Sequence, residues 1–214
     1  MADDAMYRMF PALALLCAIP LAGCGAAKPE EPPLAGARIG GPFTLIDQNG
    51  RTVRDGDFAG RYRIVYFGYT YCPDVCPTDM AKIGQAMKIL DKEAPRIAAK
   101  IAPIFITVDP ERDTPAAIKQ FVANFHPGIV GLTGSPQAIA AVAKSYAVYF
   151  KKQPPGPGGG YMVDHLAVAF LMGPNGEPIL VPAGTTKEAP KTTTVLVDED
   201  AAYSFSITGD NGLD

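Results

Sequence analysis

The chain has 214 residues, of which 48% are hydrophobic and 19% are charged, so it can bury one substantial core. Its 19 basic and 22 acidic residues leave a net charge of −3 without a run of Lys or Arg, which argues against a nucleic-acid partner held by phosphate neutralisation. Four cysteines are too few and too scattered for a disulfide scaffold.

Residues 1–23 have the pattern of a secretion signal. Arg8 precedes the apolar stretch Phe10 to Ala22, which is shorter than the ~20 residues that a membrane-spanning helix needs. The string LAGC at its end resembles a bacterial lipobox, which implies cleavage before Cys24 and attachment of lipid to it. An uncleaved membrane anchor and an ordinary secretory signal are the alternatives.

The remainder of the chain divides into three parts. Residues 24–37 are rich in Pro, Glu and Ala without periodicity, which indicates a flexible tether. One folded domain is expected over residues 38–182, and a divergent tail over residues 183–214. Cys17 would be lost with a cleaved signal, which would leave two free thiols in the domain.

The domain opens with a predicted hairpin and a buried strand. Phe43 to Asp47 alternates weakly, and the dipeptide Asn49-Gly50 favours a hairpin turn before the next short strand. The β-branched and aromatic run over Tyr62 to Tyr69 predicts a strand that is buried in the sheet.

This strand leads into two cysteines with C-x-x-x-C spacing, Cys72 and Cys76. Each precedes a proline, so both are expected in extended or turn backbone. Pro77 suits the first position of a helix, which apolar residues at helical spacing continue to about Leu90. Cys76 is therefore expected at a helix N-terminus, where the helix dipole would lower the pKa of its thiol.

Strands and helices then alternate. Ile101 to Val108 is a continuous apolar run, typical of a strand buried on both faces. Thr114 and Ser135 each precede a proline and are predicted to cap two further helices. Val148 to Phe150 is a candidate for a further short strand.

A flexible glycine loop over residues 152–160 precedes two final strands, Leu166 to Met172 and Ile179 to Val181. The pattern predicts an α/β sandwich with a central mixed sheet, an N-terminal hairpin and a terminal hairpin. A dithiol between the first long strand and its helix makes a thioredoxin-like topology the most economical version.

Two thiolates and one neutral imidazole would make a three-coordinate site that suits a soft ion such as Cu(I). The chain has two histidines. His165 is expected to start the strand beside the dithiol, with Asp164 as a candidate partner for its ring, although neighbours in a strand point apart. The alternative for His165 is a structural role as a hydrogen-bonded histidine. His126 follows a helix and is expected to have a structural role.

Four strings, FGYTYCPDVCP, TVDPERDTP, GLTG and YMVDH, occur in an order that resembles the SCO/SenC family of copper-binding proteins, over roughly Pro42 to Pro178. The resemblance implies a thioredoxin-like fold and one copper ion, Cu(I) or Cu(II), held by Cys72, Cys76 and His165. It also implies a membrane-tethered metallochaperone that helps to build the dinuclear copper centre of cytochrome c oxidase.

The partners expected from this resemblance are the copper-receiving oxidase subunit and other copper chaperones. A lipid on Cys24 would hold the protein at the bacterial cell envelope, with its domain in the periplasm. Family members typically end with a helix, whereas Tyr203, Phe205 and Ile207 alternate with polar residues, which predicts a strand. A closing hairpin or a segment without regular structure is therefore expected in the tail.

A thiol–disulfide reductase that keeps the oxidase's copper-ligand cysteines reduced is the alternative function. Cys72 and Cys76 would then be catalytic, since a lowered thiol pKa also serves exchange. The C-x-x-x-C spacing has one residue more than the C-x-x-C of disulfide oxidoreductases, which weakens the comparison with those enzymes. A peroxidase is disfavoured because the chain lacks Trp, and zinc storage because a fourth ligand is not obvious.

Two further features have alternative interpretations. The charged residues of the DPERDTP string, Asp109 to Pro115, either cap the next helix or form a docking surface for the partner, and the cap is favoured. The tyrosines around the dithiol either belong to the core or shield the metal, and the core is favoured; they are Tyr66, Tyr69 and Tyr71.

Overall fold

The computed structural model describes residues 38–156, 159–180, 193–198 and 201–205. The predicted signal, the tether and the predicted lipid attachment at Cys24 lie outside the described residues. Among the helices of the described ranges, none has the length and apolar character that crossing a membrane requires.

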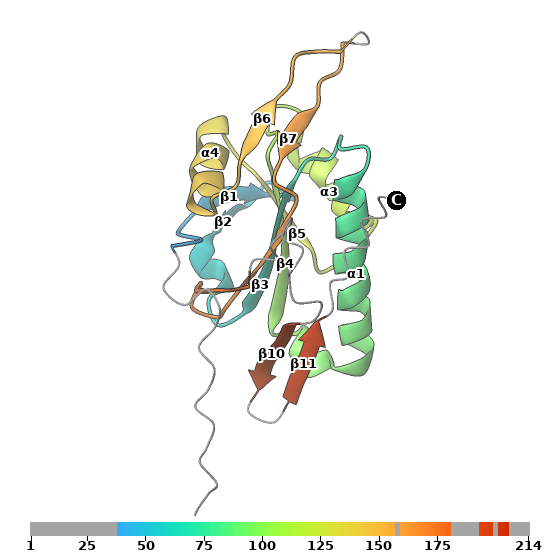
Figure 1. Ribbon diagram of the computed structural model, residues 1–214, viewed down its shortest axis with the longest axis vertical. Coiled ribbons are helices and arrows are strands. Elements are labelled where there is room, and N and C mark those ends of the chain that lie inside the picture. The colour runs from blue at the N-terminus through green and yellow to red at the C-terminus, as the bar shows by residue number, and fades with distance from the viewer. Residues whose placement is uncertain (1–37, 157–158, 181–192, 199–200, 206–214) are drawn as a thin grey trace, which may run out of the picture. The chain divides into compact units, whose positions relative to one another are not determined.

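A seven-stranded mixed sheet forms the centre of the domain (Figure 1). Its strands are β1 (Thr44–Asp47), β2 (Thr52–Arg54), β3 (Tyr62–Gly68), β4 (Ile101–Thr107), β5 (Val130–Thr133), β8 (Ala169–Met172) and β9 (Pro178–Leu180). Their order across the sheet is β2-β1-β5-β4-β3-β8-β9, with β3, β4 and β5 parallel and the other pairs antiparallel. The predicted mixed sheet is confirmed.

The centre of the sheet consists of β3 and β4. Every residue of β4 is buried, as its continuous apolar sequence predicts. The two strands are parallel from the pair Tyr62 and Ile101 to the pair Gly68 and Thr107, so the chain between them must cross over outside the sheet. The crossover consists of α1 (Val75–Glu93) and α2 (Pro95–Ala98). β3 therefore ends near the middle of the sheet, and a short irregular segment joins it to α1.

The remaining helices are a 3₁₀ turn η1 (Asp55–Phe58), α3 (Pro115–Ala123) and α4 (Pro136–Ser145). In Figure 1, α1 and α4 lie on opposite sides of the sheet. The predicted caps are confirmed: the hydroxyl of Thr114 accepts from the N–H of Ala117, and that of Ser135 accepts from the N–H of Ala138. Side-chain capping of this kind satisfies N–H groups that have no partner within the helix.

A second, two-stranded sheet carries His165. It consists of β6 (Phe150–Lys152) and β7 (Val163–His165), and the predicted glycine loop connects them. His165 ends β7 and does not start the following strand, so that expectation is wrong. The chain changes partners after Leu166, whose N–H still bonds to the carbonyl of Tyr149, and β8 pairs with β3 from Ala169 onward.

The tail contains a hairpin. β10 (Thr193–Asp198) pairs antiparallel with β11 (Ala201–Phe205), which places Tyr203 and Phe205 in a strand, as their alternation with polar residues predicts. Ile207 lies outside the described residues. The described part of the tail is therefore a hairpin rather than the terminal helix that is typical of the family it resembles.

Candidate metal centre

Both cysteines lie beyond the end of β3. The chain leaves the sheet at Gly68, passes through Cys72 in irregular backbone, and enters α1 at Val75. The expectation of non-helical backbone is confirmed for Cys72 but wrong for Cys76, which lies in the first turn of α1. Pro77 follows within the same turn rather than opening the helix. It costs no hydrogen bond there, because the first four N–H groups of a helix have no partner within it.

Gly68 allows the Cys76 thiol to reach the end of the strand. A methyl group at Gly68 would lie 2.9 Å from Cys76 Sγ, 2.9 Å from the ring of Tyr66 and 3.1 Å from that of Phe105. Cys76 is completely buried in this contact, whereas Cys72 is 9% exposed. The dithiol thus has an inner and an outer sulfur.

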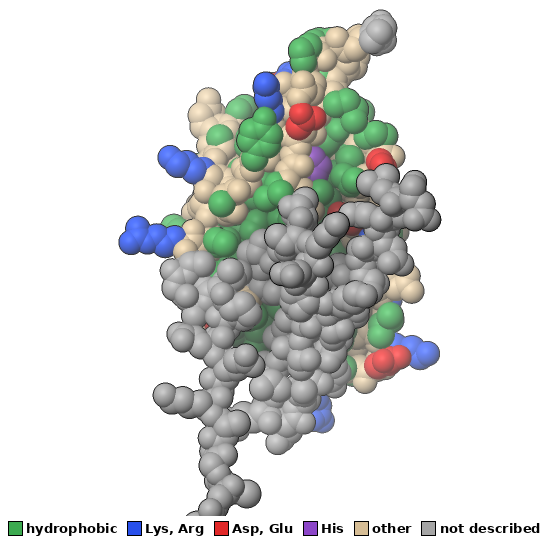
Figure 2. Space-filling view, in the orientation of Figure 1, with side chains coloured by type: hydrophobic (Ala, Val, Ile, Leu, Met, Phe, Trp, Pro, Cys, Tyr) green, Lys and Arg blue, Asp and Glu red, His purple; other side chains and the backbone are tan. Residues whose placement is uncertain are grey.

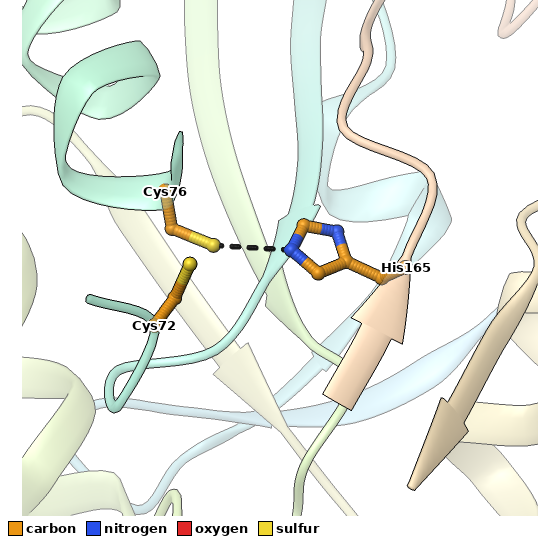
Figure 3. A group of neighbouring side chains, drawn as sticks. All are labelled: Cys72, Cys76 and His165. Carbon is orange, nitrogen blue, oxygen red and sulfur yellow. Dashed lines mark hydrogen bonds between the residues drawn. The ribbon is translucent and has the colours of Figure 1, made fainter. Parts of the chain in front are cut away.

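His165 completes the group from a distant part of the sequence. Its Nε2 atom lies 3.2 Å from Cys76 Sγ, and Figure 3 shows the imidazole directed at the two sulfurs from the end of β7. The three possible ligand atoms of Cys72, Cys76 and His165 all lie within 4.8 Å of one another. The structure therefore brings together all three residues that the sequence selected.

Hydrogen bonding indicates which ring nitrogen of His165 carries the proton and which has a lone pair available. Nδ1 lies 3.3 Å from the carbonyl oxygen of Leu166, and only a protonated ring nitrogen can donate to a carbonyl. This contact assigns the proton to Nδ1, so the lone pair of Nε2 faces Cys76. Burial lowers the pKa of the imidazole, which keeps it neutral near pH 7. A neutral imidazole with a free Nε2 can bind a metal or accept a proton.

The Cys76 thiol has a raised pKa, so the expectation that the helix dipole would lower it is wrong. Burial is the largest cause, because removing the thiolate from water disfavours the charged form, and it outweighs the lowering effect of a backbone hydrogen bond from Tyr69. A hydrogen bond with Cys72 and the charge of that neighbouring sulfur raise the pKa further. A metal ion bound here would replace the thiol proton, since thiolates rather than thiols are the ligands.

The donor set fits a soft metal ion. Metal bonds of about 2.0 Å to nitrogen and 2.3 Å to sulfur place donors roughly 3.5–4 Å apart around a three-coordinate ion. Separations of up to 4.8 Å between the three ligand atoms approach this arrangement, so a small shift of side chains is enough. Thiolate ligands favour a soft ion such as Cu(I) over harder ions, and imidazole also binds copper well.

The other histidine has a structural role, as predicted, but its partner is a carboxylate and not the helix dipole that was expected. His126 is buried, and its Nε2 lies 2.8 Å from a carboxylate oxygen of Asp91 on α1. Its Nδ1 accepts a hydrogen bond from the N–H of Gly128. Asp164 does not bond to His165, contrary to its suggested role, because its carboxylate pairs with the side-chain amide of Gln153.

The structure separates the three tyrosines near the dithiol. Tyr66 and Tyr69 belong to the core, as favoured, and the ring of Tyr69 also meets that of His165 edge to face at 5.7 Å. Tyr71 is 58% exposed and lies outside the core. Tyr69 therefore supports the imidazole through its ring.

Sequence reasoning missed how Asp113 holds the dithiol loop. This buried carboxylate accepts hydrogen bonds from the N–H and hydroxyl of Thr70, at 2.9 and 2.6 Å, and from the hydroxyl of Thr107 at 2.6 Å. The interpretation of the DPERDTP string as a helix cap is therefore incomplete. The available signal was an acidic residue in the charged string between the apolar strand β4 and the capped helix α3, but its partner loop could not be inferred from spacing.

The fold and the site define a thioredoxin-like α/β domain with two thiols and one imidazole at the end of its central strand. A family model described as SCO1/SenC matches residues 31–197. This chain belongs to the SCO1/SenC family.

Individual relatives agree with this assignment. "Protein SCO1 homolog 1, mitochondrial" from Arabidopsis thaliana is 44% identical over 146 residues, which are 68% of this chain and 42% of that protein. The chain spans about half the length of the mitochondrial relatives it matches.

Solved structures share the fold. Bradyrhizobium japonicum ScoI with copper bound is 45% identical, with a TM-score of 0.62 over 67% of this chain and 88% of that one. BsSco is described as a member of the Sco family of cytochrome c oxidase assembly proteins with a disulfide switch. It is 28% identical, with a TM-score of 0.54 over 71% of this chain and 84% of that one.

Proposed function

We propose that this protein is a copper metallochaperone, which binds one copper ion through Cys72, Cys76 and His165 and transfers it during assembly of the dinuclear copper centre of cytochrome c oxidase. The observation that carries the proposal is the convergence of the three ligand atoms within 4.8 Å. The copper-bound structure of the similar B. japonicum ScoI supports the choice of ion.

The unequal burial of the ligands suits transfer as well as binding. Cys76 is completely buried, Cys72 is 9% exposed, and the residues that precede the two cysteines, Tyr71 and Val75, are 58% and 42% exposed. An acceptor's ligands would approach from this open side and displace Cys72 and His165 before Cys76. The copper ion would then change ligands one at a time without being released into water.

Copper titration of the reduced protein tests this function. Wild type is expected to bind one Cu(I) ion, and Cys72→Ser and Cys76→Ser to lose most of the affinity. His165→Ala should weaken binding at least tenfold, since even the outer partners of metal ligands contribute about 10–100-fold. His126→Ala is the matched control, because this histidine pairs with Asp91 away from the site. Unchanged affinity in His165→Ala would remove His165 from the ligand set.

A thiol–disulfide reductase is the second candidate, supported by the closeness of the two sulfurs and by the disulfide switch described for BsSco. The raised pKa of Cys76 disfavours it as an attacking thiolate, so Cys72 would have to attack and Cys76 to resolve. An insulin-reduction assay with a measured reduction potential tests this candidate. Turnover that Cys72→Ser abolishes would support it, and absence of turnover would reject it.

We also propose that Cys24 carries a lipid that holds the domain outside the cytoplasm at the bacterial envelope. The proposal rests on the LAGC string after a short apolar segment. Mass spectrometry of the protein from membranes should show an N-terminus at a diacylated Cys24. Cys24→Ser should remain unprocessed, and cleavage at another position would contradict the proposal.

A further inference from the structure

The hairpin that carries His165 forms a sheet of its own and does not pair with the central sheet. Within the described residues, β7 pairs with β6 alone, and Figure 1 shows the two strands extending beyond the sheet. Hydrophobic side chains are exposed in this part of the face in Figure 2. The base of the hairpin packs in the core through Val163, whose N–H donates to the Tyr69 hydroxyl, and further contacts with the dithiol loop would hold the imidazole toward the sulfurs.

Arg112 makes such contacts on the hairpin side. Its guanidinium lies 3.6 Å from the centre of the Tyr161 ring, and its Nη1 donates to the Tyr161 carbonyl at 2.9 Å. The Tyr161 hydroxyl in turn donates to Asp109 at 2.8 Å, and the Nε of Arg112 donates to the same carboxylate. Tyr161 begins the segment that runs through β7 to His165, so these bonds hold the base of the histidine strand.

The same guanidinium also reaches the dithiol side. It lies 4.8 Å from the ring centre of Tyr71 and 5.7 Å from that of Tyr69, within the range of cation–π attraction. Tyr71 directly precedes Cys72. One side chain thus contacts both halves of the site, and it is only partly exposed, at 21%.

We propose that Arg112 is a positioning residue for copper binding: with Asp109, Tyr161 and Tyr71 it forms a clasp that fastens the histidine hairpin to the dithiol loop. The inference rests on the proposed copper site. While the clasp is closed, His165 supplies the third ligand. When it opens, the imidazole moves away with its hairpin and leaves a two-thiolate site, which an acceptor can attack more readily.

A double-mutant cycle tests whether Arg112 acts through His165. Arg112→Leu should weaken copper binding about tenfold, as is typical when a supporting partner of a metal ligand is lost. The same substitution should have almost no effect in a His165→Ala background, because the ligand it positions is already absent. Equal effects in both backgrounds would overturn the proposal, as would wild-type affinity in Arg112→Leu. Lys151→Ala, at an exposed position of β6, is the control.

Spectroscopy and hydrogen exchange separate positioning from general destabilisation. X-ray absorption of the copper-loaded protein should show loss of the nitrogen ligand in Arg112→Leu, with both sulfurs retained. In the copper-free protein, amides of residues 150–165 should exchange faster, while those of β4 keep their protection. Retained nitrogen ligation, or faster exchange throughout the domain, would contradict the clasp.

Two milder variants keep the test valid if Arg112→Leu folds poorly. Arg112→Lys retains the charge over the rings but loses the directed bonds to Asp109 and Tyr161. Its copper affinity should therefore lie between those of wild type and Arg112→Leu. Tyr161→Phe removes only the bond to Asp109 and should have a smaller effect. Failure of wild type itself to bind copper would reject the proposed function, whereas the hydrogen-exchange result would still decide whether the clasp exists.

Discussion

Cys76 Sγ and His165 Nε2 lie 3.2 Å apart, although 89 positions separate the two residues in the chain. The contact joins the first turn of α1 to the end of β7, which belongs to a different sheet from β3. The fold therefore places two of the three proposed ligands next to each other, which lowers the cost of orienting them for metal binding.

Gly68→Ala is expected to disturb the inner sulfur. The added methyl group would lie 2.9 Å from both Cys76 Sγ and the Tyr66 ring, so the thiol must move or the strand must shift. Overpacking of this kind typically costs about 1–3 kcal/mol of stability, and copper affinity should fall with it. Urea unfolding and copper titration measure the two effects.

Gly56→Ala provides the matched control for this substitution, since a methyl group there would meet no atom within 4 Å. It should leave copper affinity unchanged. If Gly68→Ala bound copper as tightly as Gly56→Ala, the close packing of Gly68 against the thiol would have no role in the site.

Asp113→Ala should destabilise the dithiol loop. The substitution leaves the N–H of Thr70 and the buried hydroxyl of Thr107 without their acceptor, at about 1–3 kcal/mol for each unpaired group. A loss of at least about 2 kcal/mol in unfolding free energy is expected, together with weaker copper binding. Asp57→Ala, which removes an exposed acceptor from the N–H of Arg54, should cost less than half as much. Equal losses in the two variants would argue against a special role for Asp113.

Asp47 should contribute stability that depends on pH. Burial alone would raise the pKa of this carboxyl, but hydrogen bonds from the backbone of Arg51 and Asn49 and from the Arg51 side chain outweigh it and lower the pKa below 3.8. A depressed pKa in the folded state stabilises the protein above the unfolded pKa, and this contribution is lost as pH falls through the folded value.

The difference in unfolding free energy between wild type and Asp47→Asn should therefore be largest near pH 6 and shrink as the pH falls below about 4. Urea unfolding of both proteins at a series of pH values provides the measurement. A difference that stayed constant over this range would show that Asp47 acts by geometry rather than by its charge.

Asp164→Asn is expected to leave copper affinity within about twofold of wild type. The Asp164 carboxylate pairs with Gln153, whereas Nδ1 of His165 donates to the carbonyl of Leu166. Since outer partners of metal ligands contribute about 10–100-fold, a loss of tenfold in this variant would restore Asp164 as a partner of the ring. Copper titration beside His165→Ala makes the comparison.

Local elements could be predicted because their causes are local. The apolar run of β4 and the capping residues Thr114 and Ser135 act over a few neighbouring positions, and the structure confirms them. The start of α1 and the path of His165 could not be placed in the same way. The path of His165 depends on which strand the chain pairs with, which is a property of the assembled sheet, and the start of α1 lies two residues before the proline that was expected to open the helix.

The sequence by itself determined the strand, dithiol and helix order, and it selected Cys72, Cys76 and His165 as the candidate ligands. Only the tertiary structure decided that the Cys76 pKa rises and that Arg112 contacts both halves of the site. The periodicity of the chain shows which faces are buried but not which distant side chains meet there. Such contacts arise when distant segments pack together, so the environment of the three ligands follows from the fold and not from their spacing.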